Sequence, residues 1–132
     1  MKTIKVVAAI IEKEDKILIA KRLKGKYGGN WEFPGGKYEE GETGPQAIKR
    51  EIEEEMEIEI DVKDFLCTVE CQYEEFYLVM DCFICSLITD NLVLNDHSEI
   101  KWIDKDEQID MLPADIKTIQ AYREYKSKKM NS

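Results

Sequence analysis

Acidic side chains recur at helical spacing in the first half of the chain. Residues 50–55 are Arg-Glu-Ile-Glu-Glu-Glu, so Glu51, Glu54 and Glu55 stand at i, i+3 and i+4 and project from one face of a helix. Two like charges about 4 Å apart cost roughly 4 kcal/mol at an effective dielectric of about 20. Mg²⁺ prefers oxygen ligands and commonly binds between one or two carboxylates and the phosphates of a substrate. The spacing therefore indicates either a solvated charged face or a divalent-metal site that acts on phosphates.

A glycine pair and one more glutamate precede this acidic run. We expect Pro34, Gly35 and Gly36 to form a turn whose glycines adopt conformations closed to other residues, so that the backbone can approach a ligand. The carbonyl oxygens of this turn could then complete a metal shell, and its amides could approach a phosphate. Glu42 stands one loop before the helix. These residues extend the predicted site upstream of the helix.

The spacing of these residues resembles the Nudix box, G-x5-E-x7-R-E-U-x-E-E-x-G-U, in which U is a bulky aliphatic residue. Eight of its nine defined positions match, at Gly36, Glu42, Arg50, Glu51, Ile52, Glu54, Glu55 and Ile58. The segment 31–37 resembles the lead into the box in MutT-like members, and the hairpin before it ends in Lys-Arg as theirs often does. The resemblance covers most of the chain.

The resemblance implies a Mg²⁺-dependent hydrolase, with Mn²⁺ as a possible substitute, that splits a pyrophosphate linkage in a nucleoside triphosphate. The implied metal ligands are Glu51, Glu54, Glu55 and the Gly35 carbonyl. Glu51 and Glu54 also belong to the implied catalytic group, in which Arg50 holds the carboxylates in place and Glu42 supports the cluster. Metal ions in such a site polarise a bridging phosphate and help to deprotonate an attacking water.

A further acid is implied downstream. Many family members carry one about six residues before a tryptophan, and Asp96 stands six residues before Trp102. The resemblance makes Asp96 an extra metal ligand or a base, and an ordinary turn aspartate is the equal alternative. We expect His97, beside it, to be a surface loop residue and not a catalyst.

Contacts to the substrate are predicted at several positions. Arg22 and Lys37 could contact the phosphate chain, with plain surface cations as the alternative, and Gly36 could bring its amide to a phosphate. Tyr77 and Phe76 lie on an expected strand where one of them could stack on a base. Core packing is the alternative for both aromatic residues.

The segment 112–115 bears on the choice of base. It resembles the place where MutT-like enzymes put a side chain against the base edge, Asn for oxidised guanine nucleotides and Asp in some that act on cytidine nucleotides. Asp115 therefore favours CTP or dCTP, cleaved to the monophosphate and pyrophosphate, although it could equally cap the helix that starts there. The competing functions are an 8-oxo-dGTP diphosphatase and a nucleotide sensor that does not hydrolyse. Retention of every acidic box position favours an enzyme.

One box position departs from the family pattern, because Glu57 replaces the usual glycine. That glycine is suited to ending the helix in a left-handed conformation, in which a residue with a Cβ costs roughly 1 kcal/mol. An acid at a helix C-terminus also opposes the helix dipole. We expect the substitution to affect stability more than catalysis.

Composition limits the partners and the location of the protein. The 132 residues suffice for one domain, 1–132, and the net charge of −9 argues against binding long nucleic acid. No apolar run approaches the roughly 20 residues that span a bilayer, and the run 6–11 meets a charge too soon for a signal peptide. We expect a cytoplasmic protein, monomeric or homodimeric, with a small nucleotide as its partner.

The four cysteines are not expected to bind zinc or form a disulfide. Cys82 and Cys85 have the spacing of a metal or redox motif, but they lie in an apolar stretch without Gly or Pro. Residues three apart on a strand face opposite sides. We therefore expect buried, reduced thiols.

The remaining pattern predicts the elements that position the site. Residues 3–12 and 16–22 form a hairpin, 24–30 a loop, 31–33 a brief strand and 43–56 a helix with a capping box of Thr43 and Gln46. Strands follow at 62–73, 76–88, 92–94 and 100–103, and a helix begins at Pro113 and frays from residue 126. Ile116, Ile119 and Tyr122 should share its buried face. The predicted class is α+β, a Nudix fold in which helices sandwich a curved mixed sheet (α/β/α).

Overall fold

The computed structural model describes residues 1–23, 25 and 27–130. Lys24 and Lys26 of the predicted loop, and residues 131–132 of the predicted frayed end, lie outside the described residues. The described elements are β1 (Lys2–Lys13), β2 (Lys16–Arg22), β3 (Trp31–Glu32), β4 (Gly35–Lys37), α1 (Gly44–Met56), β5 (Ile60–Gln72), β6 (Phe76–Leu87), β7 (His97–Ile103) and α2 (Pro113–Met130).

The strands form one mixed sheet that opens between β1 and β2. In the described part of the chain its order is β3-β2-β1-β6-β5, with β4 pairing to β1 and β7 pairing to β2. The neighbours β1 and β6 run parallel along their length, whereas β1 and β2 pair only beside their turn, at Glu12↔Ile17 and Lys13↔Lys16. Beyond that point β4 pairs with β1 and β3 pairs with β2, while β7 pairs with β2 from Ile17, beside the turn, to Arg22. The candidate active site lies at this opening.

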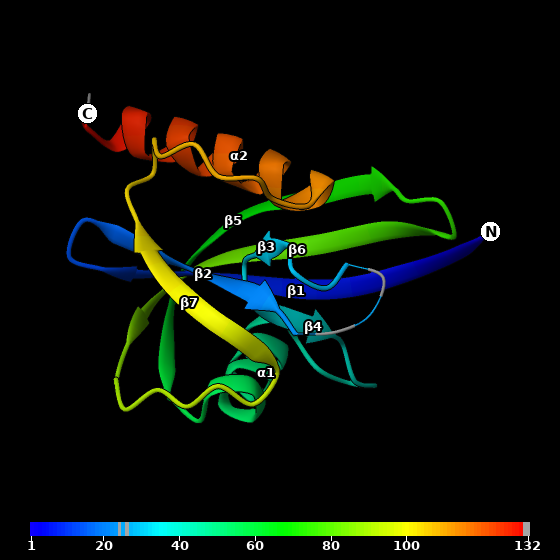
Figure 1. Cartoon of the computed structure of the whole chain (residues 1–132), viewed down its shortest axis with the longest axis horizontal. Coiled ribbons are helices and arrows are strands. Elements are labelled where there is room, and N and C mark those ends of the chain that lie inside the picture. The colour runs from blue at the N-terminus through cyan, green and yellow to red at the C-terminus, as the bar shows by residue number, and fades with distance from the viewer. Residues whose placement is uncertain (24, 26, 131–132) are drawn as a thin grey trace.

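The two helices cover opposite faces of the sheet (Figure 1). Alternate residues of β1 serve the two faces: Val7 and Ala9 pack in the cluster with α1, and Ala8 and Ile10 pack in the cluster with α2. A strand buried on both faces is a continuous apolar run in sequence, as residues 6–11 are. The predicted α/β/α sandwich with a mixed sheet is confirmed.

Helix α1 begins and ends as its sequence indicates. The Thr43 side chain accepts from the Gln46 amide and the Gln46 side chain accepts from the Thr43 amide, which confirms the capping box. At the other end Glu57 is left-handed, with φ 54° and ψ 37°, and its N–H donates to Glu53 O at 2.9 Å. The family's glycine position is thus a strained residue in this chain.

The strand predicted at 92–94 is wrong. This segment instead caps α1, because the Val93 amide donates to Met56 O at 2.9 Å and the Asn95 amide donates to Glu55 O at 3.0 Å. The last carbonyls of a helix have no partner within the helix, so a chain that supplies donors there is held irregular. An apolar tripeptide can do this as readily as it can form a strand.

Three other predictions need correction. Strand β7 starts at His97, three residues before the predicted start, and α2 continues to Met130 where fraying was expected from residue 126. Lys126 stays in the helix near Glu12, with 3.4 Å between Nζ and Oε2. Ile119 and Tyr122 are buried as predicted, but Ile116 is 42% exposed because the buried face of α2 is turned away from it.

We predict that Glu57→Gly raises the melting temperature by about 3 °C, because glycine adopts the left-handed cap without the roughly 1 kcal/mol cost of a Cβ. The variant loses one exposed contact, in which Asn95 Nδ2 donates to Glu57 Oε2 at 3.0 Å. Thermal unfolding measures the effect, and Glu57→Ala, which loses the same contact and keeps the Cβ, is the control. Equal melting temperatures for the two variants, or a large change in turnover with Gly, would contradict this assignment.

Candidate active site

The opening between β1 and β2 leads to a cavity of about 440 Å³, here called the acidic cavity. Strands β2, β3, β4 and β7, helix α1 and the turn before β7 all contribute to it. Its charged and polar lining includes Arg22, Glu32, Glu51, Glu55, Asp96 and His97, with Gly35 in its wall. Four acids therefore face one arginine and one histidine in a confined space.

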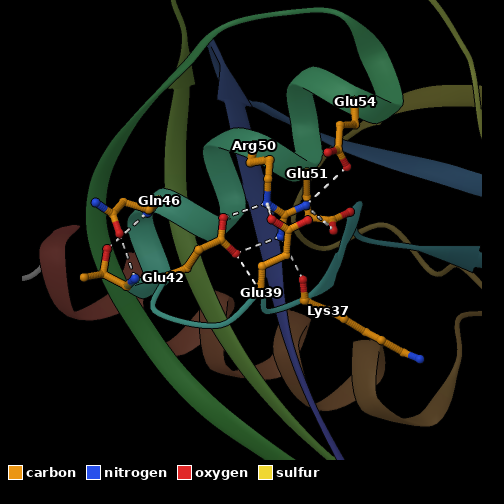
Figure 2. Close-up of polar contacts among 8 residues, drawn as sticks. Lys37, Glu39, Glu42, Gln46, Arg50, Glu51 and Glu54 are labelled. Carbon is orange, nitrogen blue, oxygen red and sulfur yellow. Dashed lines mark hydrogen bonds and ion pairs between the residues drawn. The ribbon is translucent and has the colours of Figure 1, made fainter.

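Arg50 organises the surface beside this cavity (Figure 2). Its Nε and Nη2 donate to the two oxygens of Glu42 at 2.6 and 2.8 Å, and its Nη1 donates to Glu51 Oε1 at 2.9 Å. Nη2 also donates to the Lys37 carbonyl at 3.0 Å. The guanidinium lowers the pKa of the Glu42 carboxyl to about 2. Glu42 is placed to fix Arg50, and Arg50 to fix Glu51.

Glu54 shares Arg50 Nη1 with Glu51 but does not line the acidic cavity with Glu55, so the predicted convergence of three carboxylates needs correction. The Glu54 side chain is 57% exposed and lies 3.2 Å from Arg50 Nη1, on a shallow surface shared with Arg50 and Glu53. Residues 54 and 55 are about 100° apart around a helix, so Glu51 can share a side with each of them while they diverge. The acidic cavity takes Glu51 and Glu55.

Glu55 is the buried acid of the site. It is 4% exposed, and its Oε2 has no hydrogen-bond partner among the described residues. Burial raises the pKa of the Glu55 carboxyl well above its usual range, and the nearby Glu51, Glu32 and Asp96 raise it further. Burial makes the ionised form of this carboxyl unfavourable. A metal ion bound to it would stabilise that form and replace the proton.

His97 and Glu32 belong to the site, which the sequence did not predict. His97 is 5% exposed and is not the expected surface loop residue: its Nε2 lies 3.0 Å from Glu32 Oε2 and 3.8 Å from Glu55 Oε1. Arg22 Nη1 donates to Glu32 Oε1 at 2.8 Å. The predicted strand began at residue 100, so His97 was assigned to the loop before it, whereas it is the first residue of β7. Alternation along the short strand before the glycine pair was the only signal for Glu32.

Residues 35 and 36 of β4 must be glycine because neighbouring atoms leave no room for a Cβ, and not because the chain turns there. The described glycines with positive φ are Gly25, Gly29 and Gly41, so the predicted turn at Gly35 and Gly36 is wrong. A Cβ on Gly35 would lie 1.9 Å from the Val7 carbonyl oxygen, and a Cβ on Gly36 would lie 2.3 Å from Glu51 Oε2. The bare backbone lets β4 lie against both β1 and the acidic side chains.

These residues fit a divalent cation in a particular way. No group of three or more acidic, histidine or cysteine side chains in the described ranges is already arranged as a metal shell. Mg²⁺ is usually held by one or two carboxylates together with substrate phosphates, and not by an all-protein cage. The unpartnered Glu55 oxygen beside Glu51, with Gly36 leaving room for that carboxylate, meets this demand.

A second cavity of about 270 Å³, here called the aromatic cavity, adjoins the first and shares Arg22, Glu32 and Gly35 with it. Tyr27, Tyr73 and Phe76 line one side. The Tyr73 and Phe76 rings stack with centroids 5.0 Å apart, and Tyr27 meets Tyr73 edge to face at 5.6 Å. Such a surface offers flat apolar faces to a planar ligand.

Two predicted substrate contacts lie elsewhere. Tyr77 takes the opposite face of β6 from Phe76, and its hydroxyl donates to Glu70 Oε1 at 3.0 Å. Strand alternation therefore favours Phe76 of the two aromatic residues. Lys37 is exposed, and its side chain extends away from the Arg50 cluster (Figure 2).

Asp115 lines the aromatic cavity from the first turn of α2 and is 4% exposed. Its Oδ1 accepts from the Phe33 amide at 2.9 Å, which ties α2 to the segment that leads into β4. Burial raises the pKa of the Asp115 carboxyl to about 8. Neither a pure helix cap nor a free base-edge group describes it, since one oxygen is already engaged with Phe33.

Comparison with known proteins identifies the family. A family model described as the NUDIX domain matches residues 1–123. The chain is 34% identical over 125 residues to the CTP pyrophosphohydrolase of Escherichia coli (strain K12), across 92% of this chain and 93% of that protein. It is 40% identical over 76 residues to the 8-oxo-dGTP diphosphatase of Proteus vulgaris, across 57% of this chain and 68% of that protein.

Solved structures agree with this assignment. The solution structure of the E. coli ORF135 protein matches with a TM-score of 0.82 and 33% identity, over 96% of this chain and 92% of that one. A MutT Nudix hydrolase from Burkholderia pseudomallei shares the fold with a TM-score of 0.83 at 23% identity, over 92% and 98% of the two chains. The chain belongs to the Nudix family and is a hydrolase that acts on acid anhydrides, as predicted.

The family match also bears on the cofactor and the substrate class. Nudix hydrolases generally use a divalent metal and act on small nucleotide substrates. Neither described helix combines the length and the apolar character needed to cross a bilayer.

We predict that Gly36→Ala and Gly35→Ala separate function from folding. A Cβ at residue 36 meets the flexible end of Glu51 and should displace that carboxylate, so turnover falls about 100-fold and divalent-metal affinity about 10-fold while the protein stays folded. A Cβ at residue 35 meets the β1 backbone and should lower the melting temperature sharply. Calorimetry and kinetics test both, and wild-type turnover in Gly36→Ala would contradict the role given to Glu51.

We predict that Glu55 makes the metal-free protein less stable as pH rises. With a raised pKa the folded state keeps a proton that the unfolded chain loses near the ordinary value of 4.5, so the free energy of unfolding falls as pH increases above that value. Glu55→Gln should therefore melt higher than wild type at pH 8 in EDTA, with a flatter pH profile. The exposed Glu54→Gln is the control and should follow wild type. If the melting temperatures of wild type and Glu55→Gln changed in parallel with pH, the raised pKa of Glu55 would be contradicted.

Proposed function

We propose that the protein is a Mg²⁺-dependent nucleoside triphosphate pyrophosphohydrolase that converts CTP or dCTP to the monophosphate and pyrophosphate. The observation that carries this proposal is the junction of the two cavities. An aromatic cavity suited to a base opens onto an acidic cavity suited to a cation and phosphates, and Arg22 and Glu32 stand at the boundary. Their volumes, about 270 and 440 Å³, suit a ligand with a small planar end and a larger charged end.

Charge balance supports the need for a cation. A triphosphate chain cannot approach Glu32, Glu51 and Glu55 without positive charge between them, and Arg22 is already bonded to Glu32. Glu51, Glu55 and the Gly35 carbonyl are the groups that would hold Mg²⁺, or Mn²⁺ in its place. When bound, such a cation neutralises phosphate oxygens and makes an attacking water more acidic. The protein positions the reactants and excludes competing water.

Each remaining residue then has a proposed role. Arg50 keeps Glu51 pointed into the acidic cavity, and Glu42 keeps Arg50 in place. Arg22 turns from Glu32 toward the phosphate chain when the substrate binds. Asp96, exposed in the turn before β7, serves as a base or an added ligand.

The identity of the base rests on Asp115 together with the relative's name. The E. coli protein that is 34% identical over nearly its whole length is a CTP pyrophosphohydrolase. Cytosine presents an exocyclic amine, and a carboxylate oxygen can accept from it. Oxidised guanine presents a carbonyl at the corresponding place, and an ionised carboxylate has no proton to donate to it. Because burial raises the pKa of Asp115 to about 8, this discrimination requires the cytosine amine to favour the ionised form of Asp115.

The function is tested by incubating the protein with Mg²⁺ and each of CTP, dCTP, UTP, ATP, GTP and 8-oxo-dGTP, and resolving the products by anion exchange. We expect CMP or dCMP with pyrophosphate as the main products, abolished by EDTA and by Glu51→Gln. Glu54→Gln tests separately the role predicted for that exposed side chain. Release of phosphate and CDP, or tight nucleotide binding with no product from any substrate, would overturn the proposal.

We predict that Asp115→Asn lowers kcat/KM for CTP by about 10-fold or more, because the amide that replaces one oxygen cannot accept from the cytosine amine. The other oxygen can still accept from the Phe33 amide, so the melting temperature should change little. The ratio of kcat/KM for 8-oxo-dGTP to that for CTP should rise in the variant. If this ratio of kcat/KM values were unchanged, Asp115 would have no role in recognising the base.

The proposal extends to the domain organisation, the location, the oligomeric state and the partners of the protein. We infer a single domain over 1–132 that acts in the cytoplasm on a small nucleotide, as a monomer or homodimer, and does not bind long nucleic acid. The net charge of −9 supports the last point, because phosphate backbones repel an acidic surface.

A further inference from the structure

Two of the four cysteines face one another across β5 and β6. Cys67 and Cys82 are register partners in this antiparallel pair, and both lie in the hydrophobic cluster beneath α2. Directly opposed residues of antiparallel strands have Cα atoms about 4.5 to 5.5 Å apart, inside the range of about 4.4 to 6.8 Å that a disulfide spans. The register therefore places Cys67 and Cys82 at a spacing that a disulfide can span.

The other two cysteines lack this geometry. Cys71 is paired in register with Leu78, and Cys85 with Val62. Cys85 also packs in the cluster beneath α1, on the opposite face of β6 from Cys82. The predicted divergence of residues 82 and 85 is confirmed, and the chemically relevant pair is a different one. The chain thus provides its own internal controls.

The opposed thiols differ in exposure and acidity. Cys67 is half-buried at the edge strand of the sheet, whereas Cys82 is buried. A hydrogen bond from the Cys82 thiol holds the pKa of Cys67 below its usual range and raises that of Cys82. An accessible sulfur with thiolate character beside a second thiol is the arrangement of a redox-sensitive cysteine and its resolving partner.

We propose that Cys67 and Cys82 form a reversible disulfide when the protein meets a peroxide. The Cys67 thiolate attacks one oxygen of hydrogen peroxide, the O–O bond breaks, and a sulfenic acid and one water result once a proton is taken up. The Cys82 sulfur then attacks the Cys67 sulfur, the S–O bond breaks, and a second water leaves with the Cys82 proton. Two thiols are oxidised by two electrons and one peroxide is reduced to two waters.

The disulfide would change a contact at α2. Cys82 Sγ lies 3.4 Å from Thr118 Oγ1, and the Thr118 hydroxyl donates to the Ala114 carbonyl at 3.1 Å. The one proton of the Cys82 thiol is donated to Cys67, so in the contact between Cys82 and Thr118 the sulfur accepts, and the Thr118 hydroxyl is shared between that sulfur and the Ala114 carbonyl. Oxidation would bond Cys82 Sγ to Cys67 and so alter its contact with Thr118, which lies about one turn after Asp115 in α2.

The test exposes the reduced protein to hydrogen peroxide, quenches it, and counts thiols after denaturation. The wild type should fall from four thiols to two, recover four with dithiothreitol, and yield a peptide linked between residues 67 and 82 in non-reducing mass spectrometry. Cys71→Ala and Cys85→Ala, the matched controls, should each fall from three thiols to one.

The pair variants decide the order of the steps. Cys82→Ala should form no intramolecular disulfide and should carry a sulfenic acid at Cys67 that dimedone traps, whereas Cys67→Ala should keep its three thiols. Four thiols retained in the wild type, a disulfide that involves Cys71 or Cys85, or over-oxidised Cys67 without a disulfide would each overturn the proposal. None of these readouts depends on the enzymatic activity.

Discussion

The burial of Glu55 beside Glu51 is the constraint on which the site depends. Glu55 is 4% exposed with an oxygen unpartnered among the described residues, and the neighbouring Glu51 carboxylate is fixed in place by Arg50. Such a pair is unfavourable in isolation, because burial and like charge both oppose ionisation. A divalent cation removes both penalties at once and brings the phosphate affinity that the acidic surface lacks.

The fold supplies the space for this pair through the separation of β1 and β2. The strands pair only at their turn, and β4 fills the edge of β1 with glycines that leave the Val7 carbonyl and the Glu51 side chain room. The segment after β6 caps α1 and carries Asp96 and His97 back to the same cavity. Distant parts of the chain thereby meet at the C-terminal half of α1.

Local sequence signals predicted the elements well and the side-chain directions less well. The capping box at Thr43, the two-sided apolar run of β1 and the left-handed site at Glu57 are all encoded by neighbours in sequence. The directions of Glu54 and His97 were not. Glu54 pairs with Arg50 one turn earlier in α1, whose own position depends on Glu42, and His97 pairs with Glu32 across the fold. The glycines of β4 were assigned to a turn because a close approach by a distant strand leaves no local signature.

The most direct test of the account is anomalous diffraction from crystals grown with Mn²⁺ and a non-hydrolysable CTP analogue. We expect a manganese peak bounded by Glu51, Glu55 and the Gly35 carbonyl, with the phosphates completing its shell and the cytosine ring against Tyr73 and Phe76. Manganese bound only at exposed Glu54, or Glu55 still buried without a metal beside an occupied nucleotide site, would contradict it.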